Sequence, residues 1–95
     1  MLPEAVAHLA GAYFHQDHDL EYDSPAEALE DYRDVHPADA VGALRVAIQG
    51  LLTSGTSEKE LADLWLDEGG ACYDPRDDGI SVTDWFHTML AALDR

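Results

Sequence analysis

The stretch ISVTDWFHTMLAAL, residues 80–93, carries the pattern that decides the fold. Ser81 followed by Asp84 is typical of a helix N-terminus, because the serine hydroxyl accepts a hydrogen bond from an unpaired amide of the first turn. Apolar side chains then recur at intervals of three and four residues, at Val82, Trp85, Phe86, Met89 and Leu93. This spacing predicts an amphipathic helix with one face in a core.

The same start signal, a serine followed three residues later by an acid, occurs at Ser24 and Ser57. Pro25 and Pro37 each suit the first position of a helix, where the missing amide hydrogen costs nothing. Four more apolar stripes with helical spacing lie at residues 6–13, 28–32, 41–51 and 61–65. No comparable alternating run indicates a strand. The sequence therefore predicts an all-α protein, a single-domain bundle of about five helices.

Glycines mark the expected helix ends, with Gly55 after the third stripe and the pair 69–70 after the fourth. The loop 74–79 predicts a capped turn that leads into the last helix. The segment 35–56 has no net charge and is rich in alanine and glycine. We therefore expect this segment to form the central, buried helix.

Composition limits the chain to one domain, residues 1–95, and excludes several function classes. Ninety-five residues are enough for one core but not for two, and the apolar fraction of 46% is ordinary for a chain that folds. Twenty acids against five bases give a formal net charge of −15, which disfavours direct contact with nucleic acid or an anionic membrane. A single cysteine, the absence of an export signal and the absence of a long apolar run favour a cytoplasmic protein.

Residues with catalytic or metal-binding chemistry do not form a recognisable site. His15, Asp17, His18 and Asp19 are suitable metal ligands, but four donors within five residues rarely converge on one ion. The loop 74–79 fails as a calcium loop, because Arg76 and Trp85 would occupy two ligand positions. Cys72 is interpreted as a small packed residue, and no histidine–carboxylate pair is singled out. We expect no metal, no cofactor and no enzymatic activity.

The acidic surface itself is the strongest functional signal. Between Asp17 and Asp34 there are eight acids and one base, interleaved with Tyr22 and Tyr32. Such a surface either docks onto a basic protein or is a solvated face that maintains solubility. Tyr32 lies at helical spacing from Leu29 and is expected in the core, which leaves Tyr22 as the candidate anchor. The residues expected to bind a partner are Asp17, Asp19, Glu21, Tyr22, Asp23, Glu27, Glu30, Asp31, Asp34, Asp74, Asp77 and Asp78.

The run Tyr13-Phe14-His15-Gln16-Asp17, followed by Tyr22 and by EALEDY at 27–32, resembles the opening of immunity proteins from bacterial contact-dependent growth inhibition (CDI) systems. The resemblance continues in order to the last helix, through LLTSG at 51–55, SEKEL at 57–61, Gly70, Tyr73, Asp74-Pro75, Gly79-Ile80-Ser81 and Asp84-Trp85-Phe86. It implies a small helical inhibitor that binds the toxic C-terminal domain of a protein delivered from another cell. Many such toxins are nucleases with basic clefts, so the implied partner is a cognate toxin domain with a basic surface. The resemblance specifies no oligomeric state.

One position departs from the family pattern, in which a tryptophan usually follows the Gln-Asp pair. This chain has His18 there. If the position packs in the core, His18 needs a polar partner or less burial; if it lies at the interface, the change tunes partner choice. The principal alternative function is an acidic regulator or nucleic-acid mimic that occupies a basic site on another protein.

Overall fold

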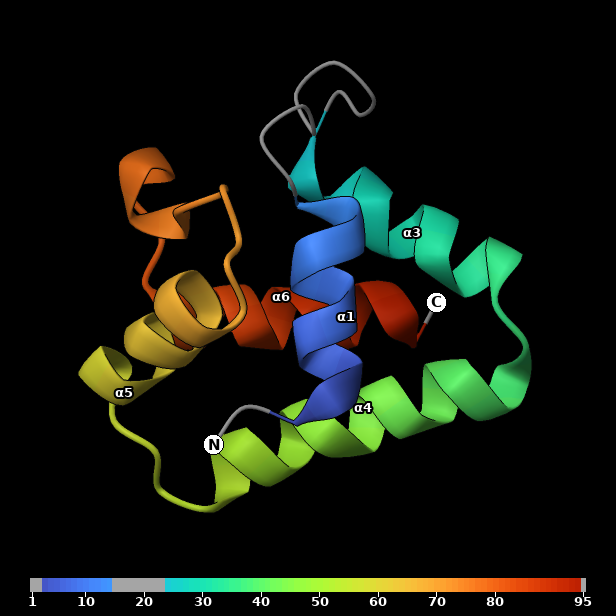
Figure 1. Ribbon diagram of the computed structural model, residues 1–95, viewed down its shortest axis with the longest axis horizontal. Helices are drawn as coiled ribbons and strands as arrows, with labels where there is room; N and C mark the ends of the chain where they lie inside the picture. The colour runs from blue at the N-terminus through green and yellow to red at the C-terminus, as the bar shows by residue number, and fades with distance from the viewer. Residues whose placement is uncertain (1–2, 15–23, 95) are drawn as a thin grey trace.

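The computed structural model describes residues 3–14 and 24–94, which form helices joined by short loops (Figure 1). The longer helices are α1 (Glu4–Tyr13), α3 (Pro25–Val35), α4 (Ala38–Thr53) and α6 (Val82–Leu93). The short helix α5 (Glu58–Ala62) continues directly into the π-helix η1 (Asp63–Glu68), and the 3-10 helix η2 (Pro75–Asp78) precedes α6. The described residues contain no strand, and the prediction of an all-α bundle of about five helices is confirmed.

Helix α6 is the centre of the fold, because it packs against α3, α4, α5 and η2. Its buried residues are Val82, Trp85, Phe86, Met89, Ala92 and Leu93. The expectation that the neutral segment 35–56 forms the central helix is wrong, because α4 buries only a narrow stripe and lies along one side of the bundle (Figure 1). Val46 on its outer face is 68% exposed. Small uncharged residues bury little apolar area, so the absence of charge does not by itself indicate burial.

Aromatic rings join the central helix to its neighbours. Phe14 at the end of α1 lies edge-to-face with Trp65 of η1 and Trp85 of α6, at centroid distances of 5.3 and 5.5 Å. The Trp65 indole Nε1 donates a hydrogen bond to the Tyr73 carbonyl at 2.9 Å. These contacts bury large apolar area and satisfy the Trp65 indole nitrogen, whereas the buried Trp85 Nε1 has no hydrogen-bond partner among the described residues. They fix η1 and the loop that follows it against α1 and α6.

The predicted helix starts are partly confirmed. The Ser57 hydroxyl accepts a hydrogen bond from the Glu60 amide, and the Ser81 hydroxyl accepts one from the Asp84 amide. Ser24 stands at the N-cap of α3, but its side chain makes no capping hydrogen bond. Pro37 is the N-cap of α4 rather than its first residue, whereas the proline that follows Ser24 does begin α3.

A carboxylate from α5 caps the central helix. The Glu58 side chain accepts hydrogen bonds from the Val82 amide at 2.7 Å and from the Thr83 amide and hydroxyl at 2.9 and 2.8 Å. Burial opposes ionisation of Glu58, but the hydrogen bonds from Thr83 and Val82 outweigh it and lower its pKa. This contact ties the α5–η1 segment to the start of α6.

Candidate partner-binding surface

The predicted acidic residues that the structure describes on α3 lie at its surface. Glu27 and Asp34 are exposed, whereas Glu30 and Asp31 are half-buried. On the same helix, Arg33 donates a hydrogen bond to the Ala92 carbonyl at 3.1 Å, which anchors α3 to the C-terminal end of α6. The remaining predicted residues of this segment, Asp17, Asp19, Glu21, Tyr22 and Asp23, lie outside the described residues, as does His18.

Two of the three predicted acids around η2 have structural roles. Asp74 accepts a hydrogen bond from the Arg76 amide and pairs with the Arg76 guanidinium at 2.8 Å. The hydrogen bond from this guanidinium holds the pKa of the Asp74 carboxyl below its usual range, against the effect of burial. Asp78 accepts a hydrogen bond from the Tyr73 hydroxyl at 3.1 Å. Asp77 is exposed. The capped turn predicted for this loop is confirmed.

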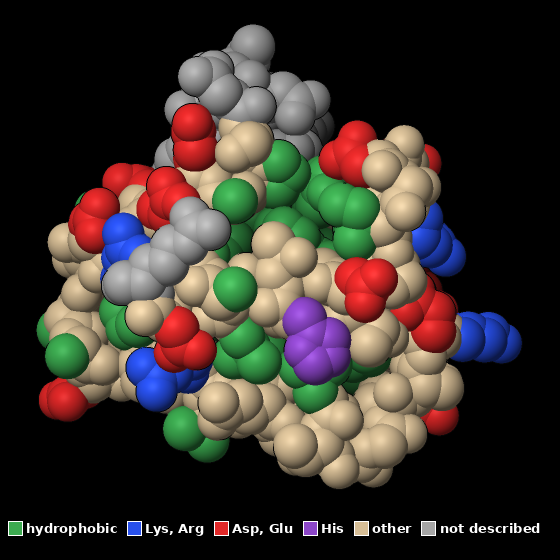
Figure 2. Space-filling view, turned by 180° about the vertical axis from the view of Figure 1, so that it is seen from behind, with side chains coloured by type: hydrophobic (Ala, Val, Ile, Leu, Met, Phe, Trp, Pro, Cys, Tyr) green, Lys and Arg blue, Asp and Glu red, His purple; other side chains and the backbone are tan. Residues whose placement is uncertain are grey.

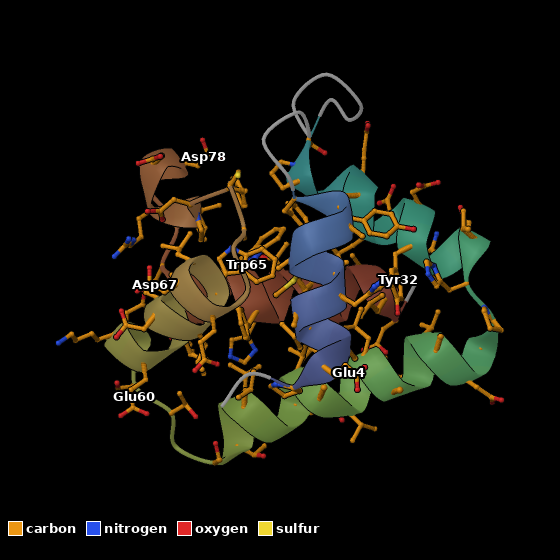
Figure 3. All side chains as sticks on the ribbon, viewed as in Figure 1. Glu4, Tyr32, Glu60, Trp65, Asp67 and Asp78 are labelled. Atoms are coloured by element: carbon orange, nitrogen blue, oxygen red, sulfur yellow. The ribbon has the colours of Figure 1, made fainter. Side chains whose placement is uncertain are left out.

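The structure does not bring the acids of α3 and of η2 together. The turn containing η2 contacts the start of α6, since the Ile80 amide donates to the Pro75 carbonyl just before that helix begins. Arg33 fixes α3 near the opposite end of α6, at Ala92. Ten residues of α-helix separate Val82 from Ala92, a distance of about 15 Å. In Figure 3, Asp78 and Tyr32 accordingly lie on different sides of α1.

Sequence reasoning missed an aromatic cluster beside the acidic face of α3. Tyr32 is 3% exposed, as predicted for a core residue. The His36 ring stacks on Tyr32 with a centroid distance of 3.9 Å, and the half-buried Tyr13 lies edge-to-face with Tyr32 at 5.5 Å. Burial, and secondly the charge of Asp31, raise the pKa of Tyr13. The position of Tyr13 at the end of the first apolar stripe was the available signal.

A second missed feature is a pair of grooves on either side of the α5–η1 segment. The acidic groove, about 490 Å³ in volume, lies between this segment and the end of α4. Its lining residues are Leu51, Ser54, Thr56, Glu60, Asp63, Leu64, Asp67 and Glu68. The mixed groove, about 570 Å³, has both acids and bases in its lining: Glu58, Lys59, Ala62, Asp63, Leu66, Asp67 and Arg76. None of these acids belongs to the set predicted from the sequence.

The remaining described surface has more scattered acidic side chains and no metal site. Figure 2 shows acidic side chains scattered over the face opposite to that of Figure 1, with a few basic ones among them. Within residues 3–14 and 24–94 no group of three or more His, Cys, Asp or Glu side chains is placed to hold a metal ion. Cys72 is exposed, so the interpretation of it as a packed residue is wrong. No described helix is long and apolar enough to cross a membrane.

Comparison with known proteins identifies the family of this chain. The model of the CdiI immunity protein family matches residues 3–93, nearly the whole chain. The chain belongs to the CdiI immunity protein family. Its resemblance to immunity proteins of growth inhibition systems is thereby confirmed, and the family is one of toxin inhibitors. No curated protein matches the sequence.

The fold of this CdiI family member is found in a solved structure. A chain in the crystal structure of the CdiA-CT/CdiI complex from Y. kristensenii 33638 superposes with a TM-score of 0.87 at 21% sequence identity. The match covers 94% of this chain and 95% of that chain. Two sequences this different share the helical architecture, whereas the surface residues of each must be considered separately.

Proposed function

We propose that this CdiI family member protects the cell that makes it by binding a cognate CdiA-CT toxin domain in a stoichiometric, inhibitory complex. The family match over residues 3–93 carries this proposal. The fold likeness to a chain of a CdiA-CT/CdiI complex supports it. Inhibition of this kind requires a stable interface and no turnover of a substrate by the inhibitor. The chain therefore acts as a binding protein, and it does so in the cytoplasm.

The toxin surface that it binds is basic. The net charge of −15 favours association with a basic partner, because complementary potentials accelerate encounter and disfavour other partners. A nuclease needs lysines and arginines to hold a phosphate backbone, so a nuclease domain with a basic cleft is the proposed toxin class. The same negative charge repels nucleic acid, so the inhibitor binds the toxin and not the toxin's nucleic-acid substrate.

The association rate and the dissociation rate of the complex depend on different residues in this proposal. Exposed acids such as Glu27, Asp34 and Asp77 attract the toxin over a distance of about one Debye length. Buried aromatic contacts then determine the dissociation rate, because interface hot spots are enriched in tyrosine and tryptophan. Tyr22 remains the proposed anchor from the sequence, and Tyr13 beside Asp31 is a half-buried aromatic residue of the described surface.

A protection assay tests the proposed function. The toxin domain encoded beside this chain is induced in cells that either carry or lack the protein, and colony survival is counted. Survival only in cells that carry the protein supports the proposal. A catalytically inactive toxin domain controls for the burden of expression. Equal killing with and without the protein contradicts the proposal, and a pull-down that instead recovers a DNA-binding factor favours the acidic-regulator alternative.

A further inference from the structure

The α5–η1 segment carries more negative charge than its structural roles require. Residues 58–68 contain five acids and one base, Lys59. Glu58 has a structural role as the cap of α6. Among the residues that the structure describes, Glu60, Asp63 and Asp67 form no ion pair with a basic side chain. Of the five acids, the fold uses Glu58, Glu68 has an interaction of its own, and Glu60, Asp63 and Asp67 remain available at the surface.

The position of Asp67 is electrostatically unfavourable for the isolated protein. It lies in the last turn of η1, which contains no basic residue, and the carbonyl groups at a helix C-terminus carry partial negative charge. Asp63 stands four residues before it, so two like charges are neighbours along one helix. A positive group supplied by another molecule would relieve both repulsions. A carboxylate that destabilises its own helix is consistent with a role in binding.

The two grooves beside this segment differ in what they can accept. The mixed groove already contains Lys59 and Arg76, and Arg76 is held by Asp74. The lining of the acidic groove includes four carboxylates and no basic residue. Leu51 and Leu64 add an apolar wall to that groove, and they are half-buried whereas its acids are exposed. The aliphatic stem of a lysine or arginine packs on such a wall while its charged end meets the carboxylates.

Figure 3 shows how the segment presents these groups. Glu60 and Asp67 lie on its outer side, whereas Trp65 points toward the centre of the bundle. The Glu58 cap on α6 fixes the start of the segment, and the hydrogen bond from Trp65 to the Tyr73 carbonyl fixes η1. A fixed surface loses little conformational entropy on binding, which favours affinity.

We propose that the acidic groove receives a lysine- or arginine-bearing segment of the toxin domain and forms a main part of the inhibitory interface. This inference rests on the proposed function and relocates its principal contact from α3 and η2 to the α5–η1 segment. The occupant is a basic protein segment, because the groove combines an apolar wall with carboxylates at its rim. A free metal cation has no apolar part that could pack against this wall.

The test measures binding and stability together. Asp67→Asn and Asp63→Asn are each titrated with the toxin domain encoded beside this chain, at low and high salt, and their melting temperatures are recorded. Each variant is expected to weaken binding about tenfold at low salt, with a smaller effect at high salt. Asp67→Asn is also expected to raise the melting temperature by about 2 °C, because it removes a charge from a helix C-terminus.

Asp39→Asn is the matched control, because it removes one exposed carboxylate from the opposite end of α4. It lies in the first turn of that helix, so its loss should slightly lower the melting temperature and leave affinity within about twofold. Unchanged affinity of Asp63→Asn and Asp67→Asn, with tight binding by the unmodified protein, would overturn the groove assignment alone. Asp67-dependent binding of spermidine together with unchanged toxin affinity would overturn it in favour of a small cation. Failure of the unmodified protein to bind would overturn the proposed function, and the groove assignment with it.

Discussion

Glu58→Gln is expected to destabilise the protein, because the Glu58 carboxylate holds the N-terminus of the central helix. Its oxygens accept hydrogen bonds from the Val82 amide and from the amide and hydroxyl of Thr83. Loss of a helix cap costs about 1 kcal/mol, and screening at this exposed position together with the remaining amide oxygen reduces the cost to about 0.5–1 kcal/mol. For a domain of this size the melting temperature should fall by about 2–8 °C.

The same contact predicts a dependence on pH. Because the hydrogen bonds lower the pKa of Glu58 in the folded state, its contribution is complete above the unfolded pKa near 4.5 and is lost as the pH falls through the folded pKa. Thermal denaturation followed by circular dichroism at pH 7 and pH 3 measures this. Glu60→Gln is the control, because it removes the same charge from the same helix without touching α6. Equal melting temperatures of the two variants at pH 7, or an undiminished Glu58→Gln difference at pH 3, would refute the assigned cap.

Three further predictions concern the core, the domain organisation and the kinetics of binding. Trp65→Phe loses the indole hydrogen bond to Tyr73 and leaves a small cavity, so urea denaturation should show about 1–3 kcal/mol of destabilisation; an unchanged midpoint would contradict this. If residues 1–95 form one domain, fluorescence and circular dichroism should report a single coincident unfolding transition, and two separated transitions would contradict it. In stopped-flow and surface-binding experiments, Asp31→Lys should mainly slow association and reduce its salt dependence, whereas Tyr22→Ala should mainly speed dissociation. Equal effects of either change on both rates would count against this division.

Local signals in the sequence predicted local structure well. Ser57 and Ser81 cap their helices because the residues involved are three positions apart, and Gly55 and Gly70 adopt the positive φ that helix ends favour. The central position of α6 was not predicted, because burial depends on which helices surround it. The capping role of Glu58 was missed for the same reason, since its partners lie 24 and 25 residues away.

The candidate binding surface was harder to predict than the fold. Acidic residues are easily counted along a chain, but their roles depend on tertiary partners. Asp74 and Asp78 were predicted to bind a partner, but in the structure both accept hydrogen bonds from residues of their own loop. Of the acids in the acidic groove, only Glu60 had been interpreted from the sequence, as part of a helix start. The groove itself was not predicted, because it forms only when the chain folds back between the end of α4 and the α5–η1 segment.

Titration calorimetry of the protein with the toxin domain encoded beside it, at low and high salt, measures the proposed neutralising complex itself. We expect one-to-one binding of nanomolar or tighter affinity that weakens as salt is added, because a polyanionic inhibitor meets a basic surface. An absence of binding at micromolar concentrations would contradict neutralisation of that toxin, and tight binding insensitive to salt would contradict the electrostatic interface.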